Sequence, residues 1–432
     1  MQKLALLGGT PLFKKTLKPC NSFGKEEVKA VTNVLKGQVL SGFLARAGNS
    51  FLGGKYVKKL EKDFCEYFNV KYAVSFNSAS TALQAAVGAL GVGPGDQVIT
   101  SPFTMSATPS AVLWNNALPV FADISEDNFC IDPKDIEKKI NKKTKAILAI
   151  NLFGNSPDYR QILKIAKKQN LKVIEDNSQS PGAVSGGKLT GTIGDISVFS
   201  FNFHKAIQAG EGGILLTNNK KYAFRAQLIR NHGEAIIDDL YGENKIYEPI
   251  LGSNFRLTEI QAAIVVEQLK KLKKLNQQRI ALANYLTKRL ECYLWLIAPK
   301  VAKNNVHVYY VYPLRFLKEK IGISRKTFAQ ALSAEGFYVA EGYQKPLYLM
   351  PMYQKKEIYP NSKFPFLSKE FSNQAKYEKG ICPVAERMYE KELLFCTICQ
   401  KPYTKKEIDL FCAAVKKIEE NVEELKKYEK KK

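Results

Sequence analysis

The sequence predicts an α/β protein, with a mostly parallel mixed sheet in a large domain and a smaller α+β domain at the C-terminus. Two patterns lead to this prediction. Short apolar runs alternate with helical runs between residues 73 and 217, as expected for a largely parallel sheet. One long helical pattern, rich in Ala, Gln, Leu and Lys, then covers residues 257 to about 290. We therefore expect a large domain over residues 1–256, and a connecting helix with a small domain over residues 257–432.

The individual elements follow from the spacing of apolar residues. An opening helix is expected at 25–35, followed by a glycine-containing loop at 37–54 and an amphipathic helix at 57–67. The strands of the large domain are expected at 73–76, 97–100, 119–122, 146–150, 171–175, 196–201 and 214–217, with helices between them at 81–90, 106–114, 133–140 and 158–169. The small domain is expected to hold a strand at 307–316, a helix at 326–335 and a final helix at 405–428.

The composition is that of a soluble globular protein, with 45% apolar and 25% charged residues in 432. The chain has 65 Lys and Arg against 41 Asp and Glu, a formal charge of +24. Because no arginine-rich block, RNA-binding signature or zinc-finger spacing accompanies this charge, we expect no nucleic-acid partner. Two interpretations of the charge stay open: long-range attraction of phosphorylated, anionic substrates, or a lysine-rich surface that only solvates the fold.

The cysteines and histidines form no recognisable metal or disulfide framework. Cys396 and Cys399 are a single CxxC pair, and the neighbouring Phe395 and Ile398 indicate a buried strand, so we expect packing there. The apolar run at 4–7 is too short for a signal peptide, and no run approaches the length that spans a membrane. The sequence therefore predicts a cytoplasmic protein with no metal and no membrane partner.

Lys205 is the most informative residue of the chain. It follows the apolar run that ends at Phe201 and precedes a glycine-rich turn. A lysine just beyond a buried strand is poorly hydrated, which lowers its pKa and frees its amine for carbonyl chemistry. Asp176 follows the preceding strand, and parallel strands end at the same edge of a sheet, so both side chains are expected at one cavity.

A reactive lysine and a carboxylate for a pyridinium nitrogen are what pyridoxal 5′-phosphate (PLP) requires of its protein. Gln179, three residues after Asp176, is a candidate hydrogen-bond partner for the 3′ oxygen of the ring. The structural alternatives are a lysine that snorkels from a strand end, an aspartate that caps the next helix, and a surface glutamine.

The candidate phosphate site is the strand-to-helix junction at residues 76–83. Free N–H groups at a helix N-terminus bind anions, and Ala79 and Ser80 are small enough to allow a close approach. Ser200, a small polar residue in an aromatic run, is a second candidate contact. The alternative is ordinary N-capping by Ser78 or Ser80.

An ordered set of motifs resembles the DegT/StrS-type family of PLP-dependent sugar aminotransferases, of aspartate-aminotransferase fold type I. The resemblance covers roughly residues 1–425. The motifs are Gly8-Gly9-Thr10-Pro11, Ala79-Ser80-Thr81-Ala82-Leu83, the 91–99 turn, Glu175-Asp176-Asn177-Ser178-Gln179, the 200–213 segment with Lys205, and the 252–263 segment with Asn254.

The resemblance implies several residue roles. Lys205 would carry PLP and then shuttle the proton during transamination, Met105 would contact the cofactor ring, and Asn254 would reach the cofactor phosphate of a neighbouring subunit. An obligate homodimer with shared sites is therefore expected. The chain departs from the family pattern where Met105 replaces a stacking aromatic residue, for which Phe103 could substitute, and where Asn151 replaces a histidine. In addition, Ala79 replaces a glycine.

The resemblance also implies the reaction. The expected function is transfer of an amino group from glutamate or glutamine to a ketone of a nucleotide-linked sugar, in aminosugar or surface polysaccharide biosynthesis. The alternatives are an aminotransferase for a keto-cyclitol such as scyllo-inosose, a PLP-dependent dehydratase or aromatising synthase, and a PLP-binding regulator without turnover. Dehydratase relatives carry histidine at the lysine position, so Lys205 favours transamination over dehydration.

Overall fold

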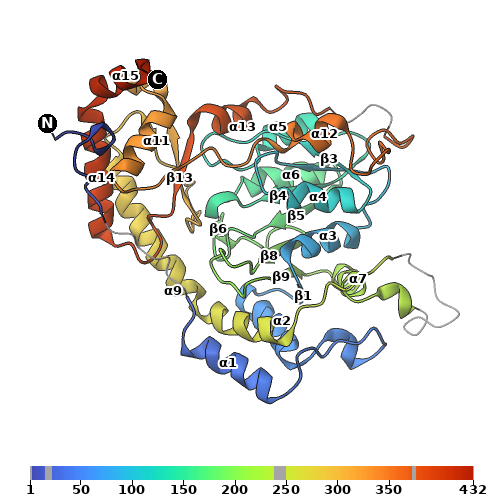
Figure 1. The fold of residues 1–432 in the computed structure, drawn as a ribbon. Coiled ribbons are helices and arrows are strands. Elements are labelled where there is room, and N and C mark those ends of the chain that lie inside the picture. The colour runs from blue at the N-terminus through green and yellow to red at the C-terminus, as the bar shows by residue number, and fades with distance from the viewer. Residues whose placement is uncertain (1, 15–21, 238–249, 372–375, 432) are drawn as a thin grey trace.

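The computed structural model describes residues 2–14, 22–237, 250–371 and 376–431. Cys20 and residues 238–249 lie outside these ranges. Two sheets organise the described chain: a seven-stranded sheet in the first half and a four-stranded sheet in the second, joined by one long helix (Figure 1).

The large sheet is mixed and mostly parallel, as predicted. Its strands are ordered β1 (Tyr72–Phe76), β9 (Gly213–Thr217), β8 (Ile196–Ser200), β5 (Lys172–Asp176), β4 (Thr144–Ile150), β2 (Gln97–Thr100) and β3 (Leu118–Phe121). β9 pairs antiparallel with both of its neighbours, and the other pairs are parallel. The strands β2, β4, β5 and β8 therefore all end at one edge of the sheet.

Helices cover both faces of this sheet (Figure 1). Apolar side chains of α3 (Ala79–Ala89), α4 (Ala107–Trp114) and α7 (Lys220–Arg230) pack with the strands on one face. On the other face the strands pack with α2 (Lys55–Phe68), α5 (Pro133–Lys139), α6 (Tyr159–Lys168) and the first part of α9 (Glu259–Leu290). α1 (Lys25–Lys36) lies against α9.

The second sheet is antiparallel and forms the core of the C-terminal region. Its order is β10 (Leu296–Ile297), β11 (Tyr312–Phe316), β13 (Leu393–Cys396) and β12 (Ala340–Glu341). The helices that pack into this core are α10 (Lys318–Ile321), α11 (Arg325–Ala334), α14 (Lys405–Glu420) and α15 (Val422–Lys430). Buried residues of α12 (Pro351–Lys355) and α13 (Pro383–Arg387) instead join the core of the large sheet.

Two segments pack across the predicted boundary at residues 256 and 257. Near the N-terminus, Leu4 and Phe13 are buried in the C-terminal core, where Phe13 stacks on Phe337 at 5.1 Å. Conversely, Tyr353 and Tyr377 pack against Phe121 of the large sheet. The exact boundary between the two domains stays a prediction.

Some predicted elements differ from the structure. The final helix is two helices, because the backbone of Asn421 (φ −107°, ψ 21°) interrupts it. The strand expected at 307–316 begins only at Tyr312, since Tyr309 has a positive φ of 49° that no strand accommodates. α7 and the short hairpin of β6 (Val184–Ser185) and β7 (Lys188–Leu189) have no counterpart in the sequence prediction.

The predictions for Cys396 and Cys399 are confirmed, because both thiols are buried. The described residues contain no group of three or more His, Cys, Asp or Glu side chains placed to hold a metal ion. Within the same ranges, none of the helices combines the length and apolar character needed to cross a membrane.

Candidate active site

A cavity of about 230 Å³ lies where the parallel strands end. Asp176 is the last residue of β5, Ser200 is the last residue of β8, and the first turn of α3 forms another wall. The lining includes Ser78, Ala79, Ser80, Leu83, Thr104, Met105, Ala107, Thr108, Ile150, Asp176, Ser178, Gln179, Ser200, Asn202, His204, Lys205, Glu211, Tyr310 and Tyr343.

The structure brings seven of the eight predicted site residues to this cavity. They are Ala79, Ser80, Met105, Asp176, Gln179, Ser200 and Lys205. The eighth, Asn254, is exposed and does not line the cavity of its own chain. Its side-chain oxygen accepts a hydrogen bond from Arg256 Nε at 2.8 Å.

Lys205 sits on the turn that follows β8, with its ammonium group largely withdrawn from water. Its Nζ lies 5.0 Å from the centre of the Tyr310 ring. Burial lowers the pKa of Lys205, and the negative charge of Asp176 opposes this effect only in part. The expectation that Lys205 has a lowered pKa is therefore confirmed.

Asp176 is buried and held in a defined orientation. Thr108 Oγ1 donates a hydrogen bond to Asp176 Oδ2 at 2.9 Å, and the Ser178 N–H donates to Oδ1 at 3.2 Å. Gln179 is also fixed, because its Oε1 accepts from the Phe153 N–H at 2.8 Å and its Nε2 donates to the Tyr343 hydroxyl at 3.1 Å. Both functional groups are thus positioned before any ligand arrives.

The N-terminus of α3 combines capping with free donors. Ser78 Oγ accepts from the Thr81 N–H at 3.2 Å, so the N-capping interpretation is correct for Ser78. This leaves the N–H groups of Ala79 and Ser80 without a helical partner at the cavity wall. β9 lies close behind them: a Cβ on Gly213 would stand 2.6 Å from the Ala79 nitrogen.

Phe103 and Met105, the two candidates for the contact with the cofactor ring, have different positions. Phe103 is fully buried and contacts the edge of Tyr343 at 5.8 Å, and it does not line the cavity. Met105 does line the cavity and is 55% exposed. Of the two candidates for the ring contact, the structure therefore offers Met105.

Comparison with known proteins agrees with this geometry. A model of the DegT/DnrJ/EryC1/StrS aminotransferase family matches residues 23–392. The chain belongs to this family. It is a PLP-dependent aminotransferase of the corresponding fold.

Individual relatives match over most of their length. The spore coat polysaccharide biosynthesis protein SpsC of Bacillus subtilis is 32% identical over 346 residues, or 79% of this chain and 86% of that protein. The GDP-perosamine synthase of Caulobacter vibrioides is 34% identical over 311 residues, with 69% and 79% covered. The structure of DesV from S. venezuelae with a ketimine intermediate has a TM-score of 0.75 at 27% identity, with 91% and 94% covered.

The cavity fits the cofactor that the family uses. PLP carries an anionic phosphate, a pyridine nitrogen that binds a proton, and an aldehyde. The cavity offers helix N–H groups, a carboxylate and an amine to these three groups in turn. The buried Oδ1 of Asn202 also has no partner among the described residues, so an acceptor is left for a ligand.

Sequence reasoning missed Thr108, Tyr310 and Tyr343. Thr108 lies three residues after Met105, inside the helix expected at 106–114, so it could have been named together with Met105. Tyr310 and Tyr343 carry no local signal, because they come from the C-terminal half of the chain. Asn151, which replaces the family histidine, is buried outside the cavity and bonded to Asn177 at 2.8 Å.

Proposed function

We propose that this enzyme transfers an amino group from glutamate or glutamine to the ketone of a nucleotide-activated sugar. The proposal rests on one observation above all: Lys205, Asp176 and the N-terminus of α3 line the same cavity. The substrate class follows from the relatives named as a GDP-perosamine synthase and a polysaccharide biosynthesis protein.

The proposed roles of the cavity residues follow from their groups. The N–H groups of Ala79 and Ser80, with the Ser200 hydroxyl, bind the cofactor phosphate, because the positive end of α3 favours an anion. Asp176 keeps the ring nitrogen protonated, and Gln179 donates to the 3′ oxygen. Met105 contacts the ring face.

Lys205 has two proposed tasks. When PLP is bound, this amine would hold it by condensing with the aldehyde carbon and releasing water, and an amino substrate would then take the place of the lysine. PLP, when bound, supplies a ring that accepts the electron pair released as the substrate Cα–H bond breaks. The freed Lys205 Nζ takes that proton. Its lowered pKa keeps a larger fraction of this amine unprotonated near pH 7, the form that can accept a proton.

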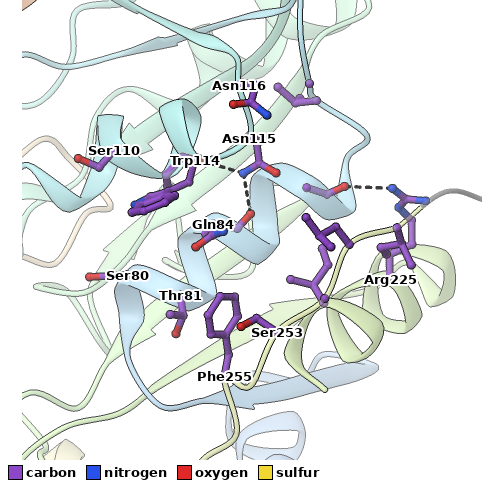
Figure 2. Close-up of a pocket in the computed structure, with 18 of the residues that line it drawn as sticks. Ser80, Thr81, Gln84, Ser110, Trp114, Asn115, Asn116, Arg225, Ser253 and Phe255 are labelled. Carbon is purple, nitrogen blue, oxygen red and sulfur yellow. Dashed lines mark hydrogen bonds between the residues drawn. The ribbon is translucent and has the colours of Figure 1, made fainter. Parts of the chain in front are cut away.

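We further propose a homodimer in which Asn254 completes the site of the other subunit. A wider cavity of about 1030 Å³ adjoins the cofactor cavity and shares Ser80 and Met105 with it. Ser253 and Phe255, the neighbours of Asn254, line this wider cavity beside α3 (Figure 2). Its rim also exposes large apolar side chains, with Trp114 66% and Leu251 83% exposed, which a second copy would cover.

A mixed-dimer experiment tests this arrangement. Asn254→Ala and Lys205→Ala are each expected to be inactive, the first through weak PLP retention and the second through loss of the amine. When the two variants are mixed, one site in each hybrid dimer has both native residues, so activity should return. Continued inactivity of a mixture shown to exchange subunits would contradict the shared site.

The reaction is tested by following the absorbance of the bound cofactor. Glutamate or glutamine should convert the yellow holoenzyme to its amino form, and a ketosugar should restore the yellow band. The acceptors to compare are UDP-, dTDP- and GDP-linked 4-keto sugars and scyllo-inosose, the keto-cyclitol alternative. Consumption of many equivalents of a ketosugar by the amino form without any donor would instead indicate the dehydratase, because a transaminase stops after one equivalent.

We also propose a cytoplasmic location and the domain division at residues 256 and 257. Every cysteine that the structure describes is a free thiol, which fits a reducing compartment. The two sheets, each with its own buried core and linked by α9, support the division.

A further inference from the structure

A second cavity, of about 460 Å³, also has Lys205 in its wall. It shares His204, Lys205 and Tyr310 with the cofactor cavity. Its other walls include residues of α9 and of the segment 397–401 that follows β13. A molecule in this second cavity would therefore touch the reactive lysine and both halves of the chain.

Arg279 of α9 lines this cavity and is a cation without a counter-charge. Burial lowers the pKa of Arg279 to about 10, yet no ion pair with Asp or Glu exists for it in the described part of the chain. Other withdrawn arginines are paired: Arg230 with Glu61 at 2.6 Å, and Arg315 with Glu392 at 3.1 Å. A poorly hydrated cation that lacks a partner is costly to keep unless an anion joins it.

The guanidinium group is held in place by neighbours. Its Nη1 donates to Asn276 Oδ1 at 3.2 Å, and Asn276 Nδ2 donates to the Pro181 carbonyl at 2.8 Å. Gly182 leaves room for this contact, since a Cβ there would stand 2.7 Å from Asn276 Nδ2.

We propose that Arg279 binds an oxyanion of a substrate while that substrate reacts at Lys205. This inference rests on the proposed function and extends it by assigning a substrate-binding residue. Tyr310 lines the same cavity as both residues, and the centre of its ring is 5.0 Å from Lys205 Nζ.

The position of Arg279 indicates which anions fit. Arg279 on α9 and Lys205 on the turn after β8 line the same cavity from different elements. One substrate can reach both when its oxyanion is several bonds away from the reacting carbon. The side-chain carboxylate of glutamate and the phosphate of a nucleotide-linked sugar both meet this condition. Both also suit the planar fork of a guanidinium group, which binds carboxylate and phosphate with two parallel hydrogen bonds.

Binding to the PLP-loaded enzyme tests the proposal without turnover. The probes are glutarate, for the donor carboxylate, and pyrophosphate, for the sugar diphosphate, each measured by calorimetric titration. Arg279→Gln should weaken the binding of one probe by about 10- to 100-fold, the effect of losing hydrogen bonds to a charged group. Arg279→Lys should retain part of the affinity. In Arg279→Gln, the substrate that carries the same anionic group as the weakened probe should show a raised KM.

The identity of the weakened probe distinguishes the two sources. Loss of glutarate binding assigns Arg279 to the amino donor, and loss of pyrophosphate binding assigns it to the sugar nucleotide. Arg289→Gln is the control: it makes the same charge change on the same helix, at a residue that pairs with Asp409 and lies outside the cavity.

Two results would overturn the inference. The first is unchanged affinity of Arg279→Gln for both probes, whether or not its melting temperature falls. The second is the absence of binding of either probe to the unaltered holoenzyme. In contrast, Arg279-dependent probe binding by an enzyme that aminates no ketosugar would refute the proposed function and leave Arg279 as an anion site.

Discussion

Replacing Thr108 with valine removes one hydroxyl group from the cavity and almost no volume. Thr108 is fully buried, and its Oγ1 is the side-chain donor to Asp176 Oδ2, at 2.9 Å. A hydrogen bond to a charged group contributes about 1.5–3 kcal/mol. Without it, the carboxylate keeps only the Ser178 N–H as a protein donor among the described contacts and is less firmly oriented toward the cofactor ring.

The expected result is a PLP dissociation constant raised by about 10- to 100-fold, the equivalent of that energy. Titration of the apoenzyme with PLP, followed by absorbance, measures it. Thr100→Val is the matched control, because Thr100 is fully buried at the end of β2 and its hydroxyl donates to the Leu148 carbonyl. Equal PLP affinity in Thr108→Val and Thr100→Val would refute the reasoning that Thr108 positions Asp176.

Three further predictions concern the cofactor site and the core. Gly213→Ala should weaken PLP binding by roughly 5- to 100-fold, since the added Cβ meets the Ala79 nitrogen at 2.6 Å and overpacking costs about 1–3 kcal/mol. Glu61→Gln should lower the free energy of unfolding by about 3 kcal/mol in urea titrations, because it leaves the buried charge of Arg230 uncompensated. The free energy of unfolding should fall by about 2 kcal/mol between pH 8 and pH 5, because burial lowers the pKa of His307 to about 3.

The sign of the His307 effect follows from linkage. The folded protein keeps His307 neutral down to about pH 3, whereas the unfolded chain takes up a proton below its ordinary pKa of about 6.5. The contribution of neutral His307 to the free energy of unfolding is thus fully present above pH 6.5. Below pH 6.5 this contribution decreases as the pH is lowered. Urea titrations of His307→Gln should show a shallower loss, and parallel curves would contradict the assignment.

For Glu61→Gln and Gly213→Ala, the control makes the same substitution at another position. Glu66→Gln changes an exposed carboxylate on the same helix and should leave stability nearly unchanged. Gly93→Ala adds a Cβ whose nearest contact is at 4.0 Å, so PLP affinity should stay at the native value. PLP binding by Gly213→Ala equal to that of Gly93→Ala would exclude close packing of β9 behind the phosphate site.

Most of the cavity could be predicted because its residues lie at strand ends. A strand followed by a polar residue is visible in the sequence at Asp176 and at Lys205, and parallel strands bring such positions to one edge. The same logic placed Ala79 and Ser80 at the start of a helix. β2 was predicted with the bounds Gln97–Thr100 that the structure shows, because turn residues flank its apolar run.

The parts that could not be predicted depend on contacts between distant segments. Tyr310, Tyr343 and Arg279 reach Lys205 only when the C-terminal half folds against the large sheet, and no local pattern marks them. The choice between Phe103 and Met105 was open for the same reason, since it depends on the burial of Phe103 against Tyr343. The break at Asn421 interrupts a continuous helical pattern at a single residue.

The central claim is that Lys205 forms the covalent bond to the cofactor, in a chain that has many other lysines. Reducing the holoenzyme with borohydride fixes the cofactor to its lysine, and peptide mass spectrometry then locates the pyridoxyl group. We predict a single modified peptide that contains Lys205. Modification of a different lysine, or an unchanged yield of modified protein in Lys205→Ala, would contradict the account.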